Sequence, residues 1–146
     1  MNLYAETSAV VAWLLDEEHS DRAWAQLTAA DVIFTSDLTL IECDRVFRRA
    51  AAIGRVTASE SLQLHAIIDT ASAHWTLLAM DAEIVQRSRR SFPCEPIRAL
   101  DAIHLATALA VRNLSPDVQV LSLDARIRDN AASLGLPVAP AAGRQP

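Results

Sequence analysis

Lysine is absent from the 146-residue sequence, and cysteine occurs only twice. Two cysteines are too few for a disulfide framework, and Cys43 and Cys94 do not have the spacing of a metal site, so we expect buried or idle thiols. No apolar run approaches the roughly 20 residues of a membrane span. Glu6 interrupts the first apolar run, so the N-terminus does not resemble a signal peptide. We therefore expect a cytoplasmic protein that does not enter a membrane.

Glycine-rich phosphate-binding motifs are also missing. The sequence contains neither G-x-G-x-x-G nor G-x-x-x-x-G-K-[ST], which argues against a dinucleotide or P-loop nucleotide site. All thirteen basic residues are arginine, which suits bidentate phosphate contacts, although a codon bias gives the same composition. The net charge of −5 argues against a passive nucleic-acid coat, which would be basic. It is compatible with an enzyme that gathers carboxylates around metal ions.

Strand and helix signals alternate along the chain. Ser8 is expected to cap the first helix, Thr57 and Glu60 form a capping box, and Gly54 ends a long helix. Strands are expected at residues 3–5, 32–35, 75–79 and 118–123, with an edge strand from about 137. Helices are expected at residues 8–15, 20–30, 38–53, 57–73, 81–92, 97–111 and 124–135. This alternation predicts an α/β domain with a mostly parallel sheet over residues 1–139, followed by a flexible tail at 140–146.

Four acidic residues map to one edge of the predicted sheet. Ligands of open parallel sheets bind beyond the carboxyl ends of the strands. The acids that belong to this edge, by their place after a strand or near the start of a helix, are Glu6, Glu42, Asp101 and Asp124. Asp101 is the most informative, because its neighbours are apolar and a carboxylate in a buried helix must be paired, hydrogen-bonded or metal-bound.

Simpler structural roles are open for two of these acids. Asp124 has the position of a helix N-cap. Glu42 could be a solvated acid that pairs with Arg45 or Arg49, at i+3 and i+7 on the same helix. The coincidence of four acids on one edge is more informative than any one of them.

Four converging carboxylates repel one another and are stable together only when cations are present. Oxygen ligands favour Mg²⁺ or Mn²⁺ over zinc, and no His/Cys cluster competes. Such ions can generate a hydroxide nucleophile and stabilise the attacking and leaving oxygens of a phosphodiester. His104, one turn after Asp101, is expected to be a core or supporting histidine rather than a ligand or base.

Four segments, in this order, resemble the PIN domain and within it the toxin nucleases of VapBC toxin–antitoxin systems: LYAETSAVV, SDLTLIECDRVFRR, LDAIHLATAL and VLSLDARIRDNAASLGLPV. The resemblance covers residues 2–138. It implies a three-layer α/β/α sandwich and an Mg²⁺- or Mn²⁺-dependent endoribonuclease. It also implies a cognate antitoxin as protein partner and a homodimer.

The resemblance also assigns roles by position. It makes Glu6, Glu42, Asp101 and Asp124 the metal-binding and catalytic acids, with Thr7 and Ser8 shaping the site. Arg45 and Arg49 are candidates for contacts with RNA phosphates, although solvent exposure or pairing with Glu42 explains each more simply. Trp13 and Trp24 could line an antitoxin groove or a dimer interface, although core packing is the more common role of such residues.

Glu6 departs from the family pattern, in which Asp is usual. The extra methylene moves the carboxylate by about 1.5 Å, one C–C bond, and Mg²⁺ requires near-ideal ligand distances. We expect a functional Glu variant, because the other three acids remain. The alternative is a catalytically weakened PIN-fold module that binds RNA or protein. A receiver-type domain fits poorly, because it requires a lysine near the site and this chain has none.

Overall fold

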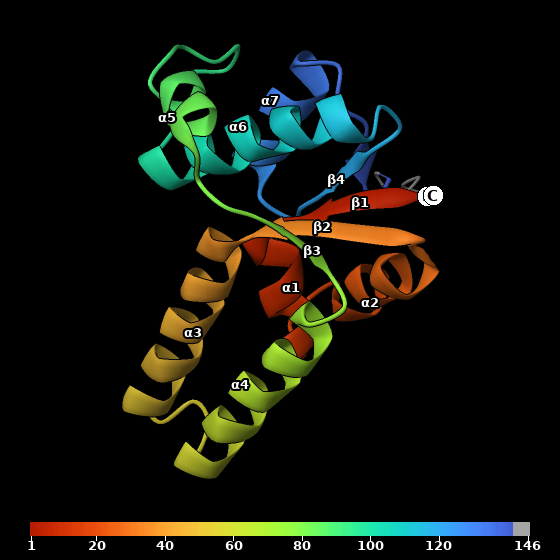
Figure 1. Ribbon diagram of the computed structural model, residues 1–146. Helices are drawn as coiled ribbons and strands as arrows, with labels where there is room; N and C mark the ends of the chain where they lie inside the picture. Colours follow the sequence, from red (N-terminus) through yellow and green to blue (C-terminus); the bar gives the residue numbers. More distant parts are fainter. Residues whose placement is uncertain (142–146) are drawn as a thin grey trace, which may run out of the picture.

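Five parallel strands form the centre of the structure, a computed structural model that describes residues 1–141 (Figure 1). The first strand, β1 (Asn2–Ala5), is hydrogen-bonded to β2 (Val32–Ser36) on one side and to β4 (Gln119–Leu121) on the other. β3 (Thr76–Leu78) and β5 (Val138–Ala139) form the two edges. The predicted α/β class is confirmed, and within the described residues the sheet is wholly rather than mostly parallel. Of the tail predicted at 140–146, positions 142–146 lie outside the described residues.

Helices cover both faces of this sheet (Figure 1). One face carries α1 (Thr7–Leu14), α2 (Ser20–Ala29), α3 (Asp37–Ala52) and α4 (Ala58–Ser72). The opposite face carries α5 (Ala82–Ser88), α6 (Ala99–Leu114) and α7 (Ala125–Ser133). The three-layer α/β/α sandwich is therefore confirmed. No helix between residues 1 and 141 has the length and apolar character required to cross a membrane.

Local capping signals set several helix boundaries. The Ser36 hydroxyl accepts a hydrogen bond of 3.3 Å from the backbone N–H of Thr39 at the start of α3. Thr57 and Glu60 form the expected capping box at the start of α4. Gly54 follows α3 with a φ of +76°, which a residue without a Cβ adopts at little cost. The predictions at Thr57 and Gly54 are confirmed.

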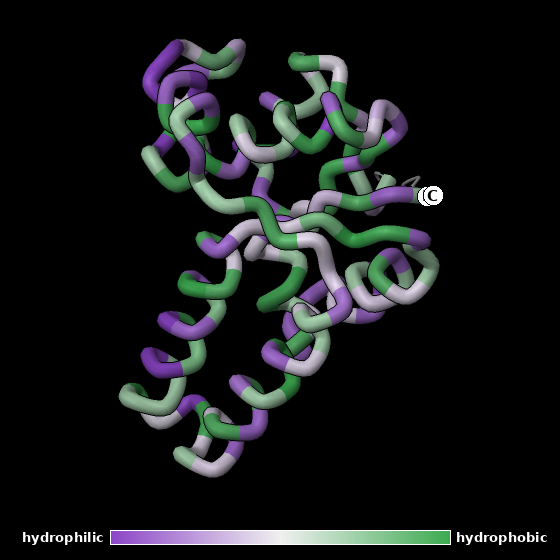
Figure 2. Tube along the Cα trace, viewed as in Figure 1, coloured by the Kyte–Doolittle hydropathy of each residue, from purple (hydrophilic) through white to green (hydrophobic). Residues whose placement is uncertain are grey.

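Side chains of the strands alternate between two cores, one under each helical layer. In β1, Leu3 and Ala5 pack against the layer that contains α1 to α4, whereas Tyr4 packs against the opposite layer. Burial on both faces explains why the strands are continuous apolar runs in the sequence. Along α3, hydrophobic and hydrophilic residues alternate within each turn in Figure 2, as expected for a helix with one face on the core.

Two boundaries near the predicted site differ from the prediction. Glu6, and not Ser8, is the N-cap residue of α1. The Ser8 hydroxyl instead accepts a hydrogen bond of 2.8 Å from the backbone N–H of Leu123. The strand predicted to reach residue 123 therefore ends at Leu121, because the next residues turn towards Ser8 and the site.

The helix predicted to reach residue 92 ends at Ser88. Phe92 leaves the helical path and is buried in the core beneath α6. The guanidinium carbon of Arg87 lies 4.1 Å from the centre of the Phe92 ring, a cation–π contact that covers the ring. Core burial of one aromatic side chain thus outweighs the helical propensity of residues 89–91.

Candidate active site at the carboxyl end of the sheet

All four predicted acids lie at the carboxyl edge of the parallel sheet. Glu6 directly follows β1, and Asp124 lies three residues after the end of β4. Glu42 lies in the second turn of α3, which directly follows β2, and Asp101 lies in the first turn of α6. Glu6 and Asp101 are buried. The structure holds the acids as two pairs, each joined by a basic side chain.

The first pair is Glu6 and Glu42, joined by His104. The Nε2 atom of His104 lies 2.5 Å from Oε1 of Glu42 and 3.9 Å from Oε1 of Glu6. Thr7 donates a hydrogen bond of 2.8 Å to Oε1 of Glu42. Ser8 donates to Oε2 of Glu6. The two hydroxyl residues predicted to shape the site therefore each hold one of these carboxylates.

Ser122 is a third hydroxyl group at this pair. It donates a hydrogen bond of 2.7 Å to Oε2 of Glu6 and accepts one of 3.1 Å from the backbone N–H of Asp124. The side chain of Glu6 is therefore satisfied by Ser8 and Ser122 on one oxygen and faces His104 with the other.

The electrostatics around the first pair favour a protonated His104 beside an ionised Glu42. Burial alone would lower the pKa of His104, but the Tyr4 hydroxyl, 2.9 Å from Nδ1, and the carboxylates of Glu42 and Glu6 outweigh it and raise the pKa to about 10. Burial alone would raise the pKa of Glu42, but the hydrogen bonds from His104 and Thr7 and the charge of His104 lower it overall. His104 is buried, as predicted, and supports Glu42 through an ion pair.

The second pair is Asp101 and Asp124, joined by Arg98. The Nε atom of Arg98 donates to Oδ2 of Asp101 at 3.2 Å, and Nη2 donates to Oδ1 of Asp101 at 3.4 Å. The same Nη2 lies 3.6 Å from Oδ2 of Asp124. Oδ1 of Asp124 accepts hydrogen bonds from the backbone N–H groups of Arg126 and Ile127. The N-cap role predicted for Asp124 is therefore confirmed, and its other oxygen still faces the site.

The donor set has the chemistry of a hard divalent cation site, since it consists of four carboxylates. In this structure Arg98 and His104 neutralise these acids in two pairs, and no group of three or more His, Cys, Asp or Glu side chains within residues 1–141 converges as a metal site. The two pairs are neighbours, because Glu42 of the first pair and Asp101 of the second line the same cavity. A cavity of about 330 Å³ lined by Glu42, Arg98, Ala99, Leu100 and Asp101 opens between them.

Arg45 and Arg49, the predicted candidates for RNA phosphate contacts, are both exposed on α3. Within the part of the chain that the structure describes, neither forms an ion pair with Glu42, which pairs with His104 instead. Both arginine side chains are therefore exposed to solvent, and their contact with RNA phosphates stays a prediction.

Sequence reasoning missed three residues of the site: Tyr4, Arg98 and Ser122. Arg98 carried a detectable signal, because it lies three residues before Asp101, a spacing that brings side chains together on a helix. Ser122 stands two residues before Asp124, but a serine at the end of an apolar strand carries no signal of its own. Tyr4 carried no such signal, because its partner His104 is 100 residues away in the sequence.

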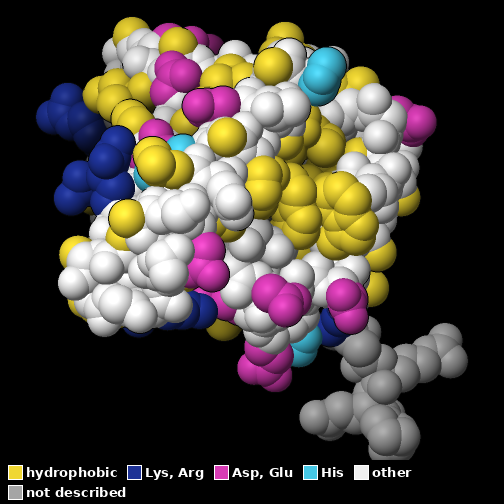
Figure 3. Space-filling view, turned by 90° about the horizontal axis from the view of Figure 1, so that it is seen from below, with side chains coloured by type: hydrophobic (Ala, Val, Ile, Leu, Met, Phe, Trp, Pro, Cys, Tyr) yellow, Lys and Arg dark blue, Asp and Glu magenta, His cyan; other side chains and the backbone are white. Residues whose placement is uncertain are grey.

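A separate apolar groove lies between α1, α2 and α4. Hydrophobic side chains gather in a hollow on the face shown in Figure 3, which views the molecule from the side of these helices. The groove has a volume of about 550 Å³. Its lining residues are Trp13, Trp24, Leu27, Thr28, Ile33, Ala66, Ile67, Thr70, Ala71, His74 and Trp75. None of the four acids belongs to it.

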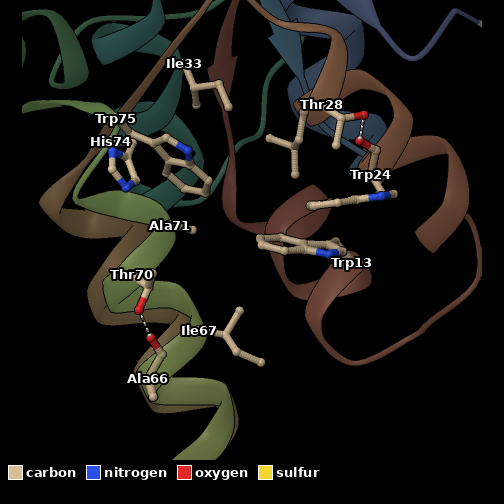
Figure 4. A pocket seen from close by; sticks show the side chains of 11 residues that line it. Trp13, Trp24, Thr28, Ile33, Ala66, Ile67, Thr70, Ala71, His74 and Trp75 are labelled. Atoms are coloured by element: carbon tan, nitrogen blue, oxygen red, sulfur yellow. Dashed lines mark hydrogen bonds between the residues drawn. The ribbon is translucent and has the colours of Figure 1, made fainter.

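Two tryptophans form one wall of this groove. Trp13 and Trp24 stack with ring centres 4.9 Å apart, opposite Ile67 and Trp75 on the side of α4 (Figure 4). Trp24 remains 47% exposed and Ile67 44% exposed. Core packing alone therefore does not account for Trp24, and the groove is an accessible apolar surface.

A model of the PIN domain family matches residues 3–133. With the fold and the acidic edge described above, this match shows that the chain belongs to the PIN domain family. Among curated proteins, it is 30% identical to ribonuclease VapC35 of Mycobacterium tuberculosis over 138 residues, which cover 93% of this chain and 94% of that protein. It is also 30% identical to ribonuclease VapC46 of the same species, with 93% and 95% coverage. The predicted likeness to VapC ribonucleases is confirmed.

Solved structures agree on the fold. FitAcB from Neisseria gonorrhoeae matches with a TM-score of 0.69 and 18% identity, covering 94% of this chain and 96% of that one. VapC20 of Mycobacterium tuberculosis, a toxin that cleaves the sarcin–ricin loop, matches with a TM-score of 0.63 and 15% identity, covering 92% and 95%. At these identities the likeness concerns the fold alone.

Proposed function

We propose that the chain is a metal-dependent endoribonuclease and the toxin of a toxin–antitoxin pair. The observation that carries this proposal is the gathering of four acids from separate segments at the carboxyl edge of the sheet. The names of the VapC ribonucleases that resemble this chain support RNA as the substrate.

The proposed cofactor is Mg²⁺ or Mn²⁺. The residues that would hold it are Glu6, Glu42, Asp101 and Asp124. When bound, such an ion supplies an activated water for attack on the phosphorus and stabilises charge on the phosphate oxygens. The products would be ends with a 5′-phosphate and a 3′-hydroxyl.

The chain itself contributes the orientation of the carboxylates. Thr7 and His104 fix one oxygen of Glu42, while Ser8 and Ser122 fix one oxygen of Glu6. His104 is bonded through both ring nitrogens, to Tyr4 and to Glu42, so its ring cannot turn without breaking a contact. Preorganised groups of this kind lower the cost of reaching the transition state.

The proposed protein partner is an antitoxin that places an apolar segment in the tryptophan-lined groove. The solved structures that match the fold include toxin–antitoxin complexes, among them VapBC2 from Rickettsia felis bound to promoter DNA. Stacked Trp13 and Trp24 offer a rigid aromatic wall, the kind of surface on which binding energy concentrates. The homodimer implied by the resemblance stays a prediction, which light scattering on the free chain tests.

Cleavage of RNA by the purified chain tests the proposed activity. We expect cleavage with Mg²⁺ or Mn²⁺, none with chelator, and a loss of at least about a hundredfold in Asp101→Asn, since transition-state stabilisers contribute on this scale. Asp129→Asn is the matched control, because Asp129 is an exposed acid on α7. Equal cleavage by wild type and Asp101→Asn would contradict the assignment.

A further inference from the structure

Arg98 connects two of the site acids although its side chain is largely in solvent. Its side chain is 66% exposed, whereas that of Asp101 is 6% exposed. The guanidinium uses Nε and Nη2 on Asp101 and shares Nη2 with Asp124. Within residues 1–141 it is the basic side chain that forms an ion pair with either aspartate. Arg98 is therefore the counter-charge of this acid pair.

The buried carboxylate of Asp101 requires such a counter-charge. A buried ionised group without a partner is strongly destabilising. The contacts of Arg98 are nevertheless loose, since distances of 3.2 to 3.6 Å exceed the 2.7–2.9 Å that is common for charge-assisted hydrogen bonds. An exposed and loosely held arginine can be displaced by a cation of higher charge.

The oxygens that Arg98 occupies are the ones that the proposed divalent cation would require. Oδ1 and Oδ2 of Asp101 and Oδ2 of Asp124 all face the guanidinium. Two cations cannot share these oxygens without strong repulsion. Arg98 is the N-cap residue of α6, so a released side chain stays anchored at the rim of the cavity that Glu42 and Asp101 line.

We propose that Arg98 exchanges partners: it neutralises Asp101 and Asp124 until a divalent cation takes their oxygens, and the released guanidinium then binds a phosphate of the RNA. This inference rests on the proposed metal-dependent ribonuclease function. The planar fork of arginine matches a phosphate as well as a carboxylate, which allows one side chain to serve both partners. The exchange couples metal loading to substrate binding.

Calorimetric titration with Mn²⁺ tests the first half of the exchange. Arg98→Gln removes the charge but keeps hydrogen-bond donors near Asp101. We expect it to bind Mn²⁺ with a Kd at least roughly fivefold lower than wild type, because the competing cation is gone. A purely structural role predicts weaker binding, since a loosened start of α6 would disorder Asp101.

Arg126→Ala is the matched control for this titration. Arg126 is exposed on the neighbouring helix α7 beside Asp124, and its side chain contacts none of the four acids within the described residues. We expect its Kd to change less than about twofold at 0.15 M salt, where exposed charges are screened. If Arg126→Ala lowers the Kd for Mn²⁺ as much as Arg98→Gln does, the effect is one of general charge and the proposed exchange is overturned.

Steady-state cleavage at saturating Mn²⁺ tests the second half. We expect Arg98→Gln to raise KM for RNA about tenfold, because one charge-assisted contact is lost. The change in kcat should be smaller. Arg98→Lys keeps a positive charge, so its KM should lie between those of wild type and Arg98→Gln. If Arg98→Gln does not fold by circular dichroism, Arg98→Lys carries both measurements, with intermediate values expected.

The outcomes separate this inference from the function on which it rests. Mn²⁺ binding with the same or a higher Kd in Arg98→Gln, or an unchanged KM, overturns the exchange alone. If neither wild type nor Arg98→Gln binds Mn²⁺, the metal-dependent function fails and the exchange fails with it.

Discussion

The Nε2 atom of His104 lies 2.5 Å from Oε1 of Glu42, although 62 residues separate the two in the sequence. The contact joins α6 on one face of the sheet to α3 on the other, around the end of β1. It is buried on the histidine side and partly exposed on the glutamate side. This ion pair therefore ties the two helical layers together at the proposed site.

Replacement of His104 by Gln should flatten the pH dependence of stability. The pKa of His104 is raised from 6.5 to about 10 in the folded protein, so its ionic contribution is complete below pH 6.5 and is lost as the pH rises through about 10. We expect the free energy of unfolding, measured with urea and chelator, to fall between these values more steeply in wild type than in His104→Gln. Equal slopes would contradict the ion pair.

Cys43 does not disturb this comparison. Burial, followed by the charges of Glu42, Asp44 and Glu6, raises the pKa of the Cys43 thiol to about 12. The contribution of Cys43 to the free energy of unfolding also declines at high pH, but wild type and His104→Gln both contain Cys43. The difference between the two slopes therefore reports His104.

Glu6→Gln should lose activity while the fold remains. The amide oxygen of Gln can still accept from Ser8 and Ser122, so we expect a loss of stability below about 1.5 kcal/mol. Removal of the negative charge should lower cleavage at least about tenfold. Urea unfolding and initial cleavage rates measure the two effects. Glu18→Gln, which changes an exposed acid, is the control, and a rate equal to that control would remove Glu6 from the site.

One of the two thiols should react in the native protein. Cys94 is exposed, whereas Cys43 is buried and has a raised pKa. At pH 8 we expect Ellman's reagent to modify one thiol per chain quickly and the second only in denaturant. Cys94→Ser should abolish the fast reaction. Two fast thiols in wild type would show that α3 opens readily in solution.

Trp24→Ala should weaken antitoxin binding more than it weakens the fold. Trp24 is half-exposed and stacks on Trp13, so truncation removes the outer ring of the groove wall. We expect the Kd for the product of an adjacent short open reading frame to rise at least about tenfold by calorimetry. Leu62→Ala, at an exposed position of α4 outside the groove, should leave the Kd unchanged. A change in oligomeric state without a change in Kd would instead identify the groove as a dimer interface.

Phe47→Ala should destabilise the layer formed by α3 and α4. Phe47 is fully buried, and its ring meets the His65 ring edge-on with centres 5.4 Å apart. Loss of a buried aromatic side chain costs about 3–5 kcal/mol. Urea unfolding should show this loss, whereas Ile41→Ala, on the exposed face of the same helix, should stay within about 0.5 kcal/mol. Similar values for the two variants would place Phe47 outside the core.

Much of the fold could be predicted because its signals are local. The capping box of Thr57 and Glu60 and the glycine after α3 act within a few residues, and the structure confirms both. The sequence predicts a helix up to Phe92 that in fact ends at Ser88, because the burial of Phe92 depends on a core that only the folded chain provides.

The position of the four acids at one edge of the sheet was predictable, whereas the contacts between these acids and their basic partners were not. Glu6 and Asp101 interrupt apolar runs, and a buried charge requires an explanation whatever the fold. That His104 holds Glu42 depends on the packing of two helices on opposite faces of the sheet. No short-range pattern in the sequence encodes this contact. Glu42 has nearer candidate partners in Arg45 and Arg49, and His104 lies one turn after Asp101.

The hydrogen bonds that hold Glu6 at the end of β1 depend on a residue that is synthesised much later. Glu6 directly follows β1, yet Ser122, which donates a hydrogen bond to Glu6, lies 116 positions later in the sequence. At about 5–20 residues per second, the first acid waits roughly 6 to 23 s for this partner. The carboxylate of Glu6 is therefore not held by both of its hydroxyl partners until Ser122 has been synthesised.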